Sequence, residues 1–198
     1  MKCFIALVKI LNPSTFPLRI IIERDVNMNR KKNLSTMEER FFLAARAIKD
    51  SITRNSPINE GGSNCPILVE GINDVKCLRV LGFSGIIETV NRGWDRPRMI
   101  AYLYETYGSE LAIDGLPRII LLMDWDRTGE ILQKSFTNQL NSMDVKIDQN
   151  LRNILAKQLK FECKTVESII GFSDSVEIKL DATELTILAT SSALAYLR

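Results

Sequence analysis

Continuous apolar runs and helical apolar stripes alternate along the middle of this chain. The runs are of strand length and lack the polar alternation of a half-exposed strand, which is typical of buried parallel strands. The pattern predicts strands over 67–70, 86–90, 118–123 and 145–147, and helices over about 73–82, 96–107, 129–143 and 149–159. Asn73 and Asp95 are the candidate N-caps of the first two of these helices. This βαβαβαβ order with short loops indicates an α/β fold, a doubly wound parallel four-stranded sheet with helices on both faces.

The segments on either side of this region follow other patterns. Ser35 and Thr36 each stand three residues before a glutamate, which predicts a helix start there, and an apolar helical stripe continues to Ile52. In the last thirty residues an edge strand over 176–180 and a helix over 182–197 are expected. We therefore divide the chain into an N-terminal extension (1–34), a helix and linker (35–60), an α/β domain (64–165) and a C-terminal extension (166–198).

Two of the predicted strands end in acidic residues. Glu70 closes the first strand, and Asp124 and Asp126 follow the third. In a doubly wound sheet of order 2-1-3-4 the first and third strands are neighbours, and such sheets bind ligands at the carboxyl ends of their strands. We expect the three carboxylates to meet there. Oxygen donors of this kind suit a hard cation such as Mg²⁺, with Mn²⁺ as a substitute, and phosphate chemistry.

The composition narrows the choice of chemistry. The chain has 45% apolar and 25% charged residues and a net charge of +2, so a nucleic-acid surface must be local. Histidine is absent, which excludes histidine bases, Ser-His-Asp triads and histidine-ligated zinc. The four cysteines have no Cys-x-x-Cys spacing, so we expect a reduced, cytoplasmic chain. The apolar stretch 1–11 contains Lys9 and is too short for a membrane span, so no membrane association is expected.

A basic segment follows the second predicted strand. Residues 91–98 contain three arginines and Trp94, and they should lie at the rim of the same crevice as the acids. Such a segment can hold a nucleic-acid backbone and stack a base, although an ordinary solvated helix start with a half-buried indole is the alternative. The predicted nucleic-acid contacts are Asn91, Arg92, Gly93 and Arg96, together with Arg127 and Gly129 at the start of the next helix.

The acidic residues also form a family pattern. Glu70, Gly71 and Asp74 give Glu-Gly-x-x-Asp, and Asp124, Asp126 and Gly129 give Asp-x-Asp-x-x-Gly. In order, spacing and position at strand ends, this resembles the Toprim family, which is named for topoisomerases and primases. The resemblance covers about residues 64–165 and is nearest to small stand-alone archaeal and bacterial Toprim proteins. The chain departs from many of these at Ile72, where a lysine often follows the Glu-Gly pair.

The resemblance implies magnesium-dependent phosphodiester chemistry on RNA or DNA. Glu70 would act as general acid/base and share in metal binding, while Asp124 and Asp126 would bind Mg²⁺. The reaction would be ribonuclease cleavage of the RNA-maturation type or primase-like nucleotidyl transfer. A ribonucleoprotein, or a replication or repair partner, would supply affinity that the small net charge does not.

Other interpretations of the same residues stay open. Asp124-x-Asp126-x-Thr128 matches the nucleophile motif of haloacid-dehalogenase-like phosphatases, but the second acidic pair of that family is missing downstream. A non-catalytic nucleic-acid-binding Toprim module is a third possibility. At the level of single residues, Asp126 and Gly129 also suit a plain turn with a helix cap, and Glu70 suits a salt bridge to Arg92. For Asp74, a first-turn acid that complements the helix dipole is the favoured interpretation.

Overall fold

The computed structural model describes residues 28–108 and 111–172. The apolar stretch 1–11 and the elements expected over 176–180 and 182–197 lie outside these residues. The chain divides into two compact units, Met1–Leu34 and Ser35–Arg198. Everything described below as a site belongs to the second unit.

Four short parallel strands form one sheet in the order β2-β1-β3-β4. The predicted fold class and strand order are thereby confirmed. The first three strands are shorter than their apolar runs, because only the residues with ladder hydrogen bonds to a neighbouring strand belong to them. The fourth differs from the predicted 145–147, since it begins at Ile147 and includes Asp148. The bounds are β1 (Ile67–Val69), β2 (Ile87–Thr89), β3 (Ile119–Leu121) and β4 (Ile147–Asp148).

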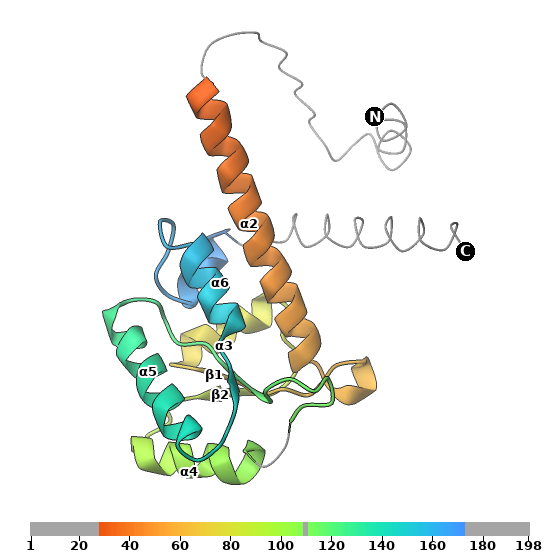
Figure 1. Cartoon of the computed structure of the whole chain (residues 1–198), viewed down its shortest axis with the longest axis vertical. Coiled ribbons are helices and arrows are strands. Elements are labelled where there is room, and N and C mark those ends of the chain that lie inside the picture. The colour runs from red at the N-terminus through yellow and green to blue at the C-terminus, as the bar shows by residue number, and fades with distance from the viewer. Residues whose placement is uncertain (1–27, 109–110, 173–198) are drawn as a thin grey trace, which may run out of the picture. The chain divides into compact units, whose positions relative to one another are not determined.

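Helices cover both faces of this sheet (Figure 1). On one face pack α4 (Arg96–Tyr107) and α5 (Arg127–Asn141); on the other pack the second-unit part of α2 (Met28–Asn55), α3 (Ile72–Val80) and α6 (Asn150–Gln158). Two 3₁₀ turns, η1 (Ile58–Glu60) and η2 (Glu167–Phe172), complete the described elements.

The central strands are buried on both faces, which explains their continuous apolar sequence. Ile67 and Val69 face one apolar cluster, while Leu68, between them, faces the other. All three side chains are fully buried, as are those of β3. Burying one side chain of this size stabilises the fold by about 1.5–3 kcal/mol. The packing therefore fixes the carboxyl ends of β1 and β3 side by side.

Helix starts agree with the sequence in one case and differ in two others. Asp95 caps α4 as predicted, with its Oδ1 accepting from the Arg98 N–H at 3.0 Å. The predicted cap at Asn73 is wrong, because α3 already begins after Gly71, whose N–H donates to the Asp74 carboxylate at 2.9 Å. The predicted start of the first helix at Ser35 is also wrong. That helix begins at Met28, since residues 28–34 contain good helix formers and neither glycine nor proline.

An arginine in the last turn of α2 forms ion pairs with two carboxylates. Arg54 donates to Asp114 Oδ2 at 2.6 Å, to Asp148 Oδ2, and to the Pro117 carbonyl at 2.6 Å. We call Arg54, Asp114 and Asp148 the Arg54 cluster. Burial of Asp114 acts to raise its pKa, but the hydrogen bond from Arg54 outweighs it and holds the pKa below the ordinary value. Each charge here has an opposite partner.

Candidate active site

Glu70 and Asp124 meet at the carboxyl edge of the sheet. Glu70 directly follows β1, and Asp124 stands three residues beyond the end of the adjacent β3. The Asp124 backbone N–H donates to Glu70 Oε1 at 3.1 Å. The parallel pairing of β1 with β3 therefore brings together two acids that lie 54 positions apart in the sequence. This edge is the switch point, because β1 lies between β2 and β3.

Asp126 and Gly129 build the turn into α5. Asp126 Oδ1 accepts from the Gly129 N–H at 2.7 Å, so Asp126 is the helix cap. A Cβ at position 129 would collide with the Asp124 carbonyl oxygen and would lie 2.7 Å from Glu70 Oε1. Only glycine lets the first turn of α5 come this close to both acids. The cap arrangement considered from the sequence is present, and it lies directly beside Glu70.

The carboxylate of Asp124 is crowded by other acids. Its Oδ1 accepts from the Val166 N–H at 2.7 Å, in the segment that leads into η2. Burial raises the pKa of Asp124 to about 7, and repulsion from Asp74, Glu70 and Asp126 adds to the rise, against the Val166 hydrogen bond. We call Glu70, Asp74, Asp124 and Asp126 the acid cluster.

The pKa of Glu70 is shifted in the same direction. Burial raises it first, and the nearby charges of Asp126 and Asp74 raise it further. The hydrogen bond from the Asp124 N–H and the positive charge of Arg152 act against this rise. A carboxyl group whose pKa moves towards neutrality is better suited to give and take protons at physiological pH.

Arg152 is a functional candidate that the sequence analysis missed. It lies on α6 with only 5% of its surface exposed. Its Nε donates to the Met123 carbonyl at 3.0 Å, and its Nη2 donates to the Asp124 carbonyl at 2.8 Å and to Glu130 Oε2 at 2.7 Å. Arg152 thus holds the backbone that carries Asp124, and none of these bonds neutralises a carboxylate of the acid cluster.

A signal for Arg152 was present in the pattern of α6. Arg152 stands three residues before Leu155 and seven before Leu159, so it falls on the buried face of an amphipathic helix. A charged residue there needs polar partners. Gln133 on α5 is a similar case, since its buried amide accepts from the Met123 N–H at 3.2 Å. Both side chains hold the end of β3.

Arg92 belongs to a separate set of hydrogen-bonded side chains around Glu88. It forms an ion pair with Glu88 and donates to the Thr89 carbonyl at 3.0 Å. Glu88 is 7% exposed and also accepts from the hydroxyls of Tyr102, at 2.7 Å, and Tyr107, at 2.8 Å. The Arg92 guanidinium lies 5.1 Å from the Trp94 ring centre. Its carboxylate partner is therefore Glu88 and not Glu70.

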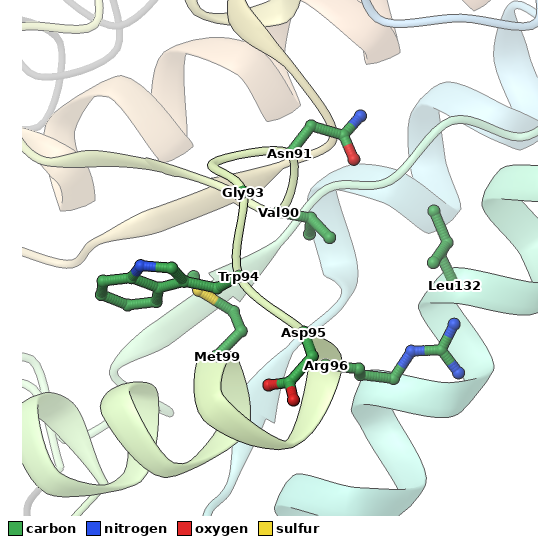
Figure 2. Close-up of a pocket in the computed structure, with 8 residues that line it drawn as sticks. All are labelled: Val90, Asn91, Gly93, Trp94, Asp95, Arg96, Met99 and Leu132. Carbon is green, nitrogen blue, oxygen red and sulfur yellow. The ribbon is translucent and has the colours of Figure 1, made fainter.

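Three of the other predicted nucleic-acid contacts, Asn91, Gly93 and Arg96, line a pocket of about 440 Å³ (Figure 2), and Arg127 and Gly129 do not. Asn91 and Gly93 form its loop side, and the Asn91 N–H donates to the Glu70 carbonyl at 2.9 Å. Arg96 reaches across to α5, where its Nη1 donates to Ser135 Oγ at 3.0 Å. Arg127 is exposed in the first turn of α5. The pocket rim is therefore fixed directly beside the acid cluster.

The acid cluster fits magnesium in its donor chemistry. Carboxylate oxygens are the ligands that Mg²⁺ prefers, and a cation would relieve the repulsion that raises the pKa of Asp124. Within residues 28–108 and 111–172, however, no group of three or more acidic, cysteine or histidine side chains stands ready to hold a metal ion. Asp124 and Asp126 each turn one oxygen to a backbone N–H. Mg²⁺ commonly binds through one or two carboxylates, waters and substrate phosphates, and this donor set allows that mode.

Comparison with known proteins gives relatives over the region that builds this site. No family model matches the chain. A UPF0292 protein of Thermoplasma volcanium is 34% identical over 107 residues, which cover 54% of this chain and 81% of that protein. The chain belongs to the UPF0292 family. UPF0292 proteins of Thermococcus sibiricus, 32% identical over 54% of this chain and 77% of that protein, and of Methanosarcina barkeri, 30% identical over 60% and 76%, are further relatives.

A solved structure also resembles this UPF0292 chain. It is a protein from Aquifex aeolicus, with a TM-score of 0.42 and 24% identity, covering 70% of this chain and 99% of that one. Within the part of the UPF0292 chain that the structure describes, none of the helices is both long and apolar enough to cross a membrane.

Proposed function

We propose that the protein is a magnesium-dependent Toprim-type enzyme that breaks or forms phosphodiester bonds in RNA or DNA. The observation that carries the proposal is the hydrogen bond between the Asp124 N–H and Glu70 Oε1, which joins two acids at the switch point of the sheet. The Glu-Gly-x-x-Asp and Asp-x-Asp-x-x-Gly patterns supply those acids, and their order and spacing support a Toprim assignment.

In this proposal Glu70 moves the proton. Its pKa is raised mainly by burial, and an acid or base works best when its pKa approaches the pH at which it acts. Asp124 and Asp126 hold Mg²⁺, which supplies charge stabilisation at the phosphate. Arg152 fixes the backbone of the loop that carries Asp124, through its bond to the Asp124 carbonyl.

In this proposal the substrate is bound by the basic residues at the rim of the crevice. Arg96 and Arg127 are exposed on α4 and α5 and can contact phosphates. A net charge of +2 gives little general attraction for nucleic acid, so a ribonucleoprotein or a replication or repair partner would contribute affinity. Cys65, Cys77 and Cys163 are free thiols, which supports placing this reaction in the reducing cytoplasm.

Two other functions have less support. A phosphatase with its nucleophile at Asp124 would need a second acidic pair downstream, and the sequence after Gly129 lacks that motif. A purely binding module has no need of a buried acid whose pKa is shifted as that of Glu70 is. Perturbed carboxyl groups in a crevice are more typical of catalytic sites.

The test is turnover of labelled structured RNA and labelled single-stranded DNA in magnesium, with and without nucleotides. Glu70→Gln keeps the shape of the side chain but cannot transfer a proton, so turnover should fall by about 100- to 10,000-fold while binding is retained. Glu105→Gln, on the exposed face of α4, should turn over like the parent. Full turnover by Glu70→Gln would show that Glu70 is a structural acid.

The same variants separate the alternatives. Hydrolysis of small phosphomonoesters that is lost in Asp124→Asn but unaffected in Glu70→Gln would establish the phosphatase. Magnesium-dependent binding without turnover in the parent protein, on every substrate offered, would establish the binding module.

A further inference from the structure

The pocket in Figure 2 has the walls of a site for a flat apolar ring. Val90, directly after β2, and Leu132, on α5, stand on either side of it, and Met99 also lines it, beside Trp94. Its volume of about 440 Å³ lies within the range of about 300–1,000 Å³ that is usual for small-ligand sites. Aliphatic walls of this kind favour a ring over a charged group.

One positively charged side chain, that of Arg96, lines the pocket. It donates one guanidinium N–H to Ser135 Oγ. A guanidinium has five such donors, so Arg96 keeps others for a phosphate. The start of α4 is not an open anion site, because the Asp95 carboxylate already caps it by accepting from the Arg98 N–H. The phosphate-binding group of the pocket is therefore a side chain.

The indole of Trp94, which also lines the pocket, already has three partners. The guanidinium of Arg92 lies 5.1 Å from the Trp94 ring centre and that of Arg98 lies 4.6 Å from it. Tyr102 packs against the indole edge to face, with ring centres 5.4 Å apart. Figure 2 shows Trp94 directed away from Leu132. A base that enters the pocket would therefore lie between Val90 and Leu132 and would not stack on Trp94.

We propose that this pocket takes a single unstacked base of a single-stranded RNA or DNA segment, with the neighbouring phosphate on Arg96. The identity of the ligand rests on the proposed function. The backbone bond from Asn91 to the Glu70 carbonyl, 2.9 Å long, ties the pocket rim to the acid cluster, so the captured base positions the next phosphodiester at Glu70. A base inside a duplex is stacked on both faces and cannot enter. The pocket thus selects single strands, or the unpaired ends and loops of structured RNA.

The test measures binding by fluorescence anisotropy with full-length protein in the presence of a chelator, so that no turnover occurs. The probes are a short single strand, its blunt duplex and an abasic sugar-phosphate tract of equal length, each made as RNA and as DNA. The parent should bind the single strand roughly tenfold more tightly than the abasic tract or the duplex, since burying one ring-sized surface between aliphatic side chains contributes about that much. One of the two sugars can bind better without altering this order.

Variants of α5 and α4 assign the effect to the pocket. Leu132→Gln should lose roughly tenfold for the single strand and nothing for the abasic tract. Ile131→Gln, on the exposed side of α5, should bind like the parent. Leu132→Phe fills the pocket while keeping its apolar packing, and it should also lose single-strand affinity, with an unchanged melting temperature as the check on folding. Arg96→Ala should weaken the single strand and the abasic tract alike.

Equal binding of all three probes, or Leu132 variants that bind the single strand like the parent, would overturn the pocket assignment. If turnover still depends on Glu70 in that case, the proposed function stands without it. If the Leu132 variants lose single-strand affinity while Glu70→Gln keeps full turnover, the pocket assignment stands and the proposed role of Glu70 falls. Absence of binding to every probe would overturn the pocket assignment, and turnover in magnesium would then decide the proposed function separately.

Discussion

Two groups of arginine and carboxylate residues in this protein are built from the same parts and behave in opposite ways. In the Arg54 cluster, the arginine bonds directly to Asp114 and Asp148, and the pKa of Asp114 is lowered despite its burial. In the acid cluster, burial and like-charge repulsion raise the pKa of Asp124 to about 7. The arginine beside it, Arg152, bonds to backbone carbonyls and to Glu130.

The difference is between carboxylates that stabilise the fold by pairing with an arginine and carboxylates that the fold holds close together without such a pair. Pairing with Arg54 stabilises the native state, so the Arg54 cluster needs no other explanation. The acid cluster destabilises the native state at neutral pH, and its repulsion is relieved only by protons or a cation. Unrelieved carboxylates in a crevice are therefore the better candidates for a working site. Four predictions test this contrast.

The largest effect is expected for Arg152→Met. Two buried carbonyls, of Met123 and Asp124, lose their donor, and each such loss costs about 1–3 kcal/mol. The free energy of unfolding in urea should fall by about 2–6 kcal/mol, and the variant should lose turnover even where it is folded. The matched variant Arg54→Met should keep its turnover per folded molecule. Equal loss of turnover in both would remove the contrast.

A smaller effect is expected for Gly129→Ala. The added Cβ meets the Asp124 carbonyl and Glu70 Oε1, so the first turn of α5 must move away from the acids. Overpacking of this kind costs about 1–3 kcal/mol, which urea unfolding would measure. Gly171→Ala, where a Cβ meets nothing within 4 Å, is the control and should be close to neutral. A neutral Gly129→Ala would show that the crevice is not closely packed.

The two clusters should respond to pH with opposite signs. The folded state binds a proton at Asp124 more tightly than the unfolded chain does, so stability should fall as pH rises from about 4 to about 7. Allowing for solvent screening at this half-buried group, the loss is about 1–2 kcal/mol, and Asp124→Asn should abolish it. Asp114, with its lowered pKa, contributes stability above pH 3.8 that is lost as pH falls through its folded pKa. Asp114→Asn should therefore be less stable than the parent at pH 7. Urea midpoints at pH 5 and pH 8 would measure the loss at Asp124, and midpoints below pH 3.8 would measure the loss at Asp114.

The smallest effect is expected from magnesium. A cation that binds only the folded state, at about five times its dissociation constant, stabilises it by about 1 kcal/mol. The melting temperature should therefore rise in millimolar Mg²⁺ or Mn²⁺, because the cation relieves repulsion in the acid cluster. The rise should vanish in Asp124→Asn/Asp126→Asn and persist in Asp114→Asn/Asp148→Asn. A rise in the first double variant as large as in the parent would place the metal elsewhere.

The fold was predictable because its two central strands are buried on both faces. Ile67–Val69 and Ile119–Leu121 lie inside the sheet, so their continuous apolar sequence has a direct physical cause. The strand order followed from the short connections and from the switch-point rule. With that order, the sequence could place Glu70 beside Asp124. Local cap chemistry also identified the start of α4 at Asp95.

The hydrogen-bond and ion-pair partners within the site could not be predicted. They depend on contacts between distant segments, which no local pattern encodes. Whether Arg152 pairs with a carboxylate or with carbonyls is decided by where α6 docks. The bond from the Val166 N–H to Asp124 depends on the path of the chain after α6. The ion pair of Arg92 with Glu88, a buried residue on β2, could not be predicted from the residues around Arg92. Tertiary packing makes these choices.

The chain separation across the acid cluster bears on how the protein is made. The bond from Asp124 to Glu70 closes 54 residues and that from Arg152 to Asp124 closes 28, so neither forms until distant segments have docked. Ribosomes add about 5–20 residues per second, and the nascent chain has all four acids before α6 emerges to brace them. A nascent chain that ends before α6 therefore lacks the bonds by which Arg152 holds the carbonyls of Met123 and Asp124. The acids of the proposed site are thus made first, and the arginine that positions them is made later.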